Sequence, residues 1–149
     1  MLKLNLPTFA IKLKEEGGKT YVFDPIRKKH LVLTPEEWVR QHVVNFLVQH
    51  KGVSPSLIAL EKSHTLNNRQ KRSDIMVYDN SGNPLLIVEC KAPSVKIDTA
   101  TFAQIANYNM AFKVNYIMVS NGLTHYVCRI NWEKKDFEFT EELPDYNKM

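Results

Sequence analysis

The sequence is poor in the features that define several protein classes. Its two cysteines, Cys90 and Cys128, are too few for a disulfide framework and lack zinc-ligand spacing. No apolar run approaches the roughly 20 residues that cross a membrane. The first residues lack the apolar core and small-residue cleavage site of a secretion signal. We therefore expect a soluble cytoplasmic protein with reduced thiols and no membrane partner.

Other catalytic signatures are also missing. The five glycines form no phosphate-cradling loop, and Gly17-Gly18 is better interpreted as a turn. No nucleophile-elbow motif surrounds any serine. The histidines are scattered without metal-ligand spacing, at His30, His42, His50, His64 and His125.

What is present fits one globular domain over residues 1–149, with 44% apolar and 24% charged residues. The net charge of +4 mildly favours a polyanionic partner. Basic residues cluster at 27–30 and again at Arg69, Lys71 and Arg72. Each cluster is either a solvated loop or a contact for phosphates, and the second directly precedes Asp74.

The stretch from Ser73 to Lys91 predicts two strands joined by a tight turn. Ser73–Asp79 alternates polar and apolar residues, and Leu85–Val88 is a run of strand-forming residues. The segment 80–83 between them consists of turn residues. This hairpin is the centre of the predicted fold.

The register of the hairpin brings two carboxylates together. If Asp79 faces Pro84, Asp74 faces Glu89, and Lys91 lies on the same face as Glu89. Facing carboxylates have Cβ atoms roughly 4.5–5.5 Å apart and destabilise a sheet unless a cation relieves them. Mg²⁺ binds one or two carboxylates together with water and phosphate oxygens. The simpler alternative is a solvated face on which Lys91 neutralises Glu89.

A first helix is predicted before this hairpin. Thr34 is a good N-cap, Pro35 suits the first helical position, and Glu37 completes a Thr-x-x-Glu capping box. Apolar residues at helical spacing follow, and Lys51-Gly52 ends the helix. The capping box by itself accounts for a glutamate at position 37.

A second helix is predicted after the hairpin, from Asp98 or Thr99 to about Phe112. Gln104 and Tyr108, four residues apart, project together from it. A glutamine and a tyrosine on a half-exposed helix face need no function, so a purely structural interpretation stays open.

Strands complete the prediction on both sides. An N-terminal hairpin turns at Gly17-Gly18, and further strands are expected at 57–60, 116–119, 126–130 and around Phe137 and Phe139. The polar segment His64–Arg72 is expected to be a loop. The tail from Glu141 is expected to be frayed.

Five motifs in this order resemble the PD-(D/E)xK nuclease superfamily. The signature Asp…Glu-x-Lys is matched by Asp74 and Glu89-Cys90-Lys91, with Ser73 in place of the usual proline, and Gln104-x-x-x-Tyr108 resembles the RecB-type branch. More narrowly, TPEEWVRQ, SDIMVYD, LLIVECKAP and SNG are similar to the N-terminal nuclease domain of type I restriction enzyme motor subunits. The resemblance covers about residues 27–131.

The resemblance implies an α/β (α+β) restriction-endonuclease-like core: a central mixed β-sheet flanked by helices in the order αβββαβ, with an N-terminal β-hairpin and C-terminal strands. It implies Mg²⁺ or Mn²⁺ bound by Asp74, Glu89 and the backbone carbonyl of Cys90. Lys91 would then orient the attacking water. Glu37 would hold a metal-bound water or a second metal. Contacts that bind DNA or position the site are assigned to Gln104, Tyr108, Arg72 and Lys71.

Two functions follow from these expectations. The first is a metal-dependent DNA endonuclease that hydrolyses phosphodiester bonds, with DNA and other restriction or defence subunits as partners. The second is a non-catalytic module that keeps the nuclease fold and binds nucleic acid or a protein partner. The intact Asp74, Glu89 and Lys91 favour the first.

Overall fold

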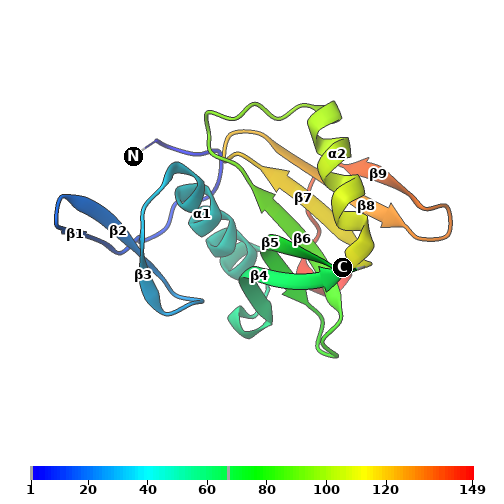
Figure 1. Ribbon diagram of the computed structural model, residues 1–149, viewed down its shortest axis with the longest axis horizontal. Coiled ribbons are helices and arrows are strands. Elements are labelled where there is room, and N and C mark those ends of the chain that lie inside the picture. Colours follow the sequence, from blue (N-terminus) through cyan, green and yellow to red (C-terminus); the bar gives the residue numbers. More distant parts are fainter. Residues whose placement is uncertain (1, 67) are drawn as a thin grey trace.

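A computed structural model describes residues 2–66 and 68–149, without the side chains of His64, Leu66, Arg69 and Lys71. Two sheets and two α-helices organise this part of the chain (Figure 1). The small sheet has the order β1-β2-β3, and the central sheet has the order β4-β5-β6-β7-β8-β9. The bounds are β1 Leu13–Glu16, β2 Lys19–Asp24, β3 Lys29–Val32, α1 Pro35–His50, β4 Ile58–Leu66, β5 Arg69–Tyr78, β6 Pro84–Cys90, α2 Thr99–Asn109, β7 Tyr116–Ser120, β8 His125–Asn131 and β9 Asp136–Thr140.

The central sheet is mixed, as expected. β6 and β7 pair in parallel and are connected through α2, whereas the other neighbouring strands pair antiparallel. A parallel pair needs such a crossover, because a short turn can join only antiparallel neighbours. From α1 to β7 the chain therefore runs helix, three strands, helix, strand.

The start of α1 follows its sequence signals. Thr34 has extended backbone, and its hydroxyl accepts a hydrogen bond from the backbone N–H of Glu37 at 3.0 Å. Pro35 occupies the first turn, where its missing N–H costs nothing. At the other end Gly52 has φ +74°, a left-handed conformation that glycine adopts without strain.

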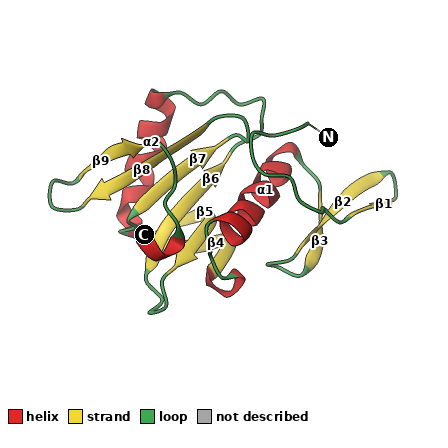
Figure 2. Ribbon diagram, turned by 180° about the vertical axis from the view of Figure 1, so that it is seen from behind, coloured by secondary structure: helices red, strands yellow, loops and turns green. Residues whose placement is uncertain are grey.

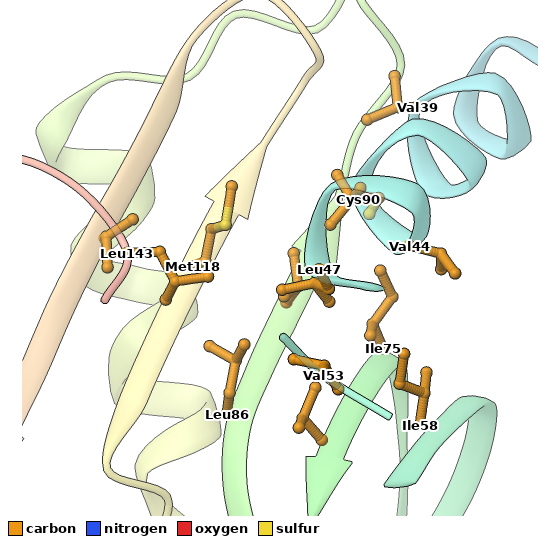
Figure 3. Close-up of a cluster of buried hydrophobic side chains, with 14 of the residues drawn as sticks. Val39, Val44, Leu47, Val53, Ile58, Ile75, Leu86, Cys90, Met118 and Leu143 are labelled. Carbon is orange, nitrogen blue, oxygen red and sulfur yellow. The ribbon is translucent and has the colours of Figure 1, made fainter. Parts of the chain in front are cut away.

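The two helices cover opposite faces of the sheet (Figure 2). Side chains alternate along β6, so Leu86, Val88 and Cys90 join the core beneath α1 while Ile87 joins the core beneath α2. Figure 3 shows Val44 and Leu47 of α1 above the strand residues of the first core. Full burial of a leucine such as Leu47 stabilises the fold by roughly 1.5–3 kcal/mol.

The small sheet extends the predicted N-terminal hairpin. Its turn lies at Gly17-Gly18 as expected, and its first strand, β1, begins at Leu13. β3 adds a third strand, pairing with β2 from Asp24↔Lys29 to Tyr21↔Val32. The sheet lies beside α1, beyond the edge of the central sheet (Figures 1 and 2).

The loop expected over His64–Arg72 is wrong. β4 continues to Leu66 and β5 begins at Arg69, so the two strands pair almost to the tip of their hairpin. The side chains described on this extension, such as Ser63 and Thr65, are exposed. A two-stranded ribbon in solvent carries no apolar alternation, so its sequence resembles a loop.

The frayed tail is also wrong. Leu143 is 2% exposed and belongs to the core beneath α1. The backbone N–H of Tyr146 donates to the carbonyl of Lys51 at 2.8 Å, and its hydroxyl donates to the carbonyl of Tyr78 at 3.2 Å. Two apolar anchors in a polar stretch are enough to dock it.

The turn of the central hairpin differs from the predicted one. Tyr78, not Asp79, pairs with Pro84, and the register shifts between Val77 and Tyr78. Asp79 instead closes the turn, and its carboxylate accepts backbone hydrogen bonds from Ser81 and Asn83, both at 2.9 Å.

Candidate active site

The site begins where β5 and β6 separate. Their interior ladder contains the pairs Ile75↔Val88 and Val77↔Leu86, which is the register that the sequence predicted for that part of the hairpin. The next step outward brings Asp74 beside Glu89. Here Oδ2 of Asp74 accepts a hydrogen bond from the backbone N–H of Cys90 at 2.8 Å. A side-chain carboxylate thus bonds to the neighbouring strand at the end of the ladder.

Glu89 is held in an unusual electrostatic state. Burial, the charge of Asp74 and a hydrogen bond to Asp74 raise the pKa of Glu89 to about 8, while Lys91 and a hydrogen bond from Asn109 oppose the rise. Two carboxylates that meet in a poorly solvated place cannot both ionise without a cation. Glu89 therefore keeps its proton at neutral pH and is hydrogen-bonded to Asp74.

A pocket of about 240 Å³ opens beside Glu89. Four elements contribute to it: β5, β6, the segment after β6, and α2. It is lined by Arg72, Glu89, Lys91, Gln104, Ile105, Tyr108 and Asn109. Five of the residues that the sequence singled out thus share one pocket. Lys71 also belonged to that set, and its side chain lies outside the described part of the structure.

The segment after β6 is anchored by the Ser120-Asn121-Gly122 turn. The backbone N–H of Lys91 donates to the carbonyl of Ser120 at 2.8 Å, and the side-chain amide of Asn121 donates to the carbonyl of Val95 at 2.8 Å. These bonds fix the backbone from which Lys91 projects into the pocket. The SNG motif therefore has a structural part in placing the lysine.

Glu37 lies away from the pocket, at the start of α1. Its carboxylate accepts two hydrogen bonds from Arg27, at 3.0 and 3.1 Å, one from Arg40 at 3.3 Å and one from Gln41 at 3.1 Å. Arg27 in turn pairs with the buried Asp24. Four hydrogen bonds from three side chains thus engage the carboxylate of Glu37.

Arg40 links this cluster to the carboxylate pair. Its side chain is 4% exposed, and its guanidinium donates to Glu61 at 2.5 Å and lies 3.5 Å from Oδ1 of Asp74. Asp74 is therefore approached by Arg40 from the side of α1 and by Glu89 from the side of α2. The contact of Arg40 with Asp74 was not predicted from the sequence.

Glu61 is the other residue that the sequence did not reveal. The ladder pairs Leu60↔Ile75 and Lys62↔Ser73 flank it, so it stands opposite Asp74 with φ +51°, a left-handed conformation that is rare for glutamate. Burial opposes its ionisation, but the hydrogen bond and charge of Arg40, with the charges of Arg72 and Arg27, lower the pKa of Glu61. Glu61 pairs with Arg40 and Arg72 only in the folded structure, so its part in the site could not be predicted from the sequence.

The donor set around Asp74 fits a hard divalent cation. The raised pKa of Glu89 beside Asp74 indicates a site with too little positive charge. Within an extended strand the carbonyl of Cys90 points to the same edge as its N–H, which donates to Asp74. Two carboxylates and one carbonyl leave positions for water, as Mg²⁺ prefers. Within residues 2–66 and 68–149, no group of three or more His, Cys, Asp or Glu side chains could hold a metal ion.

A mixed sheet with adjoining Asp and Glu carboxylates and a lysine two residues on is the arrangement of the PD-(D/E)xK nuclease superfamily. The family described as type I restriction enzyme R protein N terminus matches residues 35–144, and the chain belongs to this family.

One solved structure shows the same fold. It is described as a fragment of a candidate HsdR subunit of a type I restriction enzyme from Vibrio vulnificus YJ016, with a TM-score of 0.53 and 17% sequence identity. The match covers 76% of this chain and 24% of that one, so this chain spans about a quarter of its length. A search of curated proteins finds no match. Among the described helices, none is long and apolar enough to cross a membrane.

Proposed function

We propose that this chain is a divalent-metal-dependent DNA endonuclease domain of the restriction type, which hydrolyses phosphodiester bonds with DNA and other restriction subunits as partners. The observation that carries the proposal is the meeting of Asp74 and Glu89, which raises the pKa of Glu89 to about 8. A module that only binds DNA or protein has no need of two adjoining carboxylates that repel each other, whereas a divalent cation site uses them as ligands.

The residues have distinct tasks in this proposal. Asp74, Glu89 and the carbonyl of Cys90 hold Mg²⁺ or Mn²⁺, which when bound polarises a phosphoryl oxygen and lowers the pKa of water. Lys91 orients the attacking water and stabilises the negative charge that develops on the phosphate. Glu37 acts at a distance, because it holds Arg40 against Asp74.

The rim of the pocket supplies contacts for DNA. Gln104 is exposed and Tyr108 is half exposed on the outer turn of α2, where both can reach the phosphate backbone. Arg72 is 64% exposed on the opposite rim, with Lys71 preceding it in β5. The cation of Arg72 on one rim and polar groups on the other suit a polyanion that lies across the pocket.

The first test is calorimetric titration of Mg²⁺ and Mn²⁺ into the wild type, Asp74→Asn and Glu89→Gln, with and without a short DNA duplex. We use Asn at position 74 because Asp74 accepts the N–H of Cys90, which alanine would leave unpaired. Loss of metal binding in both variants supports the proposal. Unchanged binding in both variants places the metal elsewhere and rejects it.

Lys91→Ala separates binding from catalysis. It should keep the affinity for metal and lose cleavage of plasmid DNA, because the lysine contacts water and phosphate rather than the cation. Lys96→Ala, an exposed lysine on the same segment, serves as the matched control. Cleavage at the wild-type rate by Lys91→Ala would remove the assigned role.

A non-catalytic module with the nuclease fold is the second candidate. It is favoured by the small number of acidic ligands, since among the described residues only Asp74 joins Glu89, and Glu89 alone of the two lines the pocket. The same calorimetry separates the two functions. Absence of metal binding by the wild type even with DNA present would select the binding module.

A further inference from the structure

The charge of the chain is concentrated in its first 32 residues. They contain seven Lys or Arg and three Asp or Glu, whereas residues 33–149 contain thirteen of each. The whole net charge of +4 therefore lies in the segment that forms the small sheet and leads into it. The family match begins at residue 35, so this sheet lies outside the matched region.

One face of the small sheet combines lysines with aromatic rings in two rows. In the first row, Lys14 faces Tyr21 across the β1–β2 ladder. In the second row, the backbone N–H of Phe23 donates to the carbonyl of Lys12 at 2.9 Å, and Phe23 faces His30 on β3. Each row thus begins with a lysine and continues with an aromatic residue on β2; the first row ends in Val32 and the second in His30.

The contacts within each row bring the charge next to the rings. Nζ of Lys14 lies 5.8 Å from the ring centre of Tyr21, and Nζ of Lys12 lies 5.6 Å from that of Phe23. The rings of Phe23 and His30 are 5.2 Å apart. Lys14 also pairs with Glu16 at 3.2 Å, but both side chains are well exposed, and such a pair is worth little.

The lysine–aromatic face is accessible, whereas the opposite face is packed. Lys12, Lys14 and His30 are exposed and Tyr21 is half-buried, while Val22 on the other face is 1% exposed. Tyr21 and Phe23 are half-buried, so part of each ring stays in reach of solvent. On the opposite face only the middle of the aliphatic row is packed, because Leu13, which pairs with Val22, is 47% exposed.

The second row leads into a groove between the small sheet and α1. The groove has a volume of about 370 Å³ and is lined by Lys12 and Phe23 together with apolar residues such as Phe9, Ile26 and Val44. Three amide side chains of α1, Gln41, Asn45 and Gln49, also line the groove. A flat ring that enters it from the sheet would therefore meet apolar side chains and hydrogen-bonding groups.

We propose that this lysine–aromatic face binds single-stranded DNA, with phosphates on Lys12 and Lys14 and unpaired bases against Tyr21, Phe23 and His30. Non-specific binders of single strands combine a cationic track with aromatic platforms in this way, because every base offers a π-face. Duplex DNA hides its bases and cannot use the rings. The inference rests on the proposed function in taking DNA as the polymer.

The position of the sheet relates this face to the pocket. Arg27, in the β2–β3 turn, contacts Glu37 at 3.0 Å and Glu61 at 3.5 Å, and Glu61 is shared with Arg72 on the rim of the pocket. The small sheet is therefore fixed to the elements that carry the carboxylates. A strand held on it would lead toward the pocket along a rigid path.

The test is fluorescence anisotropy with a labelled oligothymidylate of about 16 nucleotides, in EDTA so that no metal is needed and no strand is cut. The double variant Lys12→Ala/Lys14→Ala is compared with Lys134→Ala/Lys148→Ala, which removes two exposed lysines elsewhere. The slope of log affinity against log salt should become shallower by about 1.4 in the first variant and stay unchanged in the second.

A second variant, Tyr21→Leu/His30→Leu, tests the rings without changing the lysines. Its affinity for the oligothymidylate should fall roughly tenfold or more, with the salt slope kept. Circular dichroism and thermal unfolding establish that each variant is folded. Wild-type affinity in both the lysine variant and the ring variant of the small sheet overturns the inference. Equal affinity of the wild type for a duplex of the same length also overturns it.

The outcome is separable from that of the nuclease proposal. Metal calorimetry on Lys12→Ala/Lys14→Ala should match the wild type, and Asp74→Asn should bind the oligothymidylate like the wild type. If Asp74→Asn loses metal binding while the two small-sheet variants bind the oligothymidylate like the wild type, the DNA-binding face is rejected and the metal site is kept. The reverse pattern would keep the face and reject the metal site.

Discussion

At the scale of single residues, Glu89 makes the stability of the metal-free protein depend on pH. Its pKa rises from 4.5 to about 8 on folding, so between these values the folded state binds more protons than the unfolded state. Its contribution to stability is therefore fully present below about pH 4.5 and is lost as the pH rises through about 8.

We expect the free energy of unfolding of the wild type to fall between pH 5 and 8 more steeply than that of Glu89→Gln. One proton accounts for at most about 1.4 kcal/mol per pH unit. Urea unfolding in EDTA across this range measures the difference, and Glu138→Gln, an exposed change on β9, is the control. Parallel pH profiles for wild type and Glu89→Gln would contradict the protonated pair.

Arg40 and Arg72 both pair with Glu61, but they differ in burial. The side chain of Arg40 is 4% exposed and also forms ion pairs with Glu37 and Asp74, whereas the side chain of Arg72 is 64% exposed. Removing one partner of a buried ion cluster costs about 3–5 kcal/mol, and an exposed pair contributes about 0–1 kcal/mol.

Arg40→Met should therefore destabilise the protein by about 3–5 kcal/mol and Arg72→Ala by less than about 1 kcal/mol. Guanidinium unfolding curves of the two variants give the comparison directly. A small loss in Arg40→Met would mean that the acidic residues around it do not depend on its charge.

At the scale of elements, the cap of α1 sets the position of Glu37 and Arg40. Thr34→Ala removes the acceptor for the N–H of Glu37 and should cost about 1 kcal/mol. Thr34→Ser keeps the hydroxyl and should cost less. Thermal unfolding of the two variants tests this, and an equal loss in both would assign the effect to the lost methyl group instead of the cap.

The elements with strong local signals could be predicted from the sequence. The cap at Thr34 and the start of α2 at Asp98 were found because their side chains bond to nearby backbone. The interior register of β5 and β6 was also found, although the turn was not. The shift between Val77 and Tyr78 leaves Leu85 as an extra residue, and its carbonyl accepts the N–H of Asn115.

The parts that were missed depend on contacts between distant residues. The contact of Arg40 with Asp74 joins positions 34 residues apart, and Glu61 lies opposite Asp74 only because β4 and β5 pair. No periodicity in the sequence records such contacts. The residues of the pocket could be predicted because they belong to a recognisable motif. The ion cluster of Arg40, Glu37 and Glu61 belongs to no such motif.

At the scale of the whole molecule, the C-terminal tail closes the core beneath α1. Leu143→Ala should cost about 2–5 kcal/mol, because it leaves a cavity among buried side chains. Pro144, next in the chain and only half-buried, offers a control in Pro144→Ala. Denaturant unfolding measures both, and an unchanged midpoint for Leu143→Ala would mean that the tail is not docked in solution.

The hairpin of β5 and β6 also has a consequence for how the chain folds. Its strands are separated by a turn of a few residues, whereas β7 can pair with β6 only after the whole α2 crossover has closed. Local pairings form first because their loop-closure entropy is small. We therefore expect Asp74 and Glu89 to meet in one of the local pairings that form first, so that their repulsion raises the folding barrier as well as destabilising the folded state. Refolding should accordingly be faster at pH 6 than at pH 9, so the carboxylate pair slows folding as the pH rises.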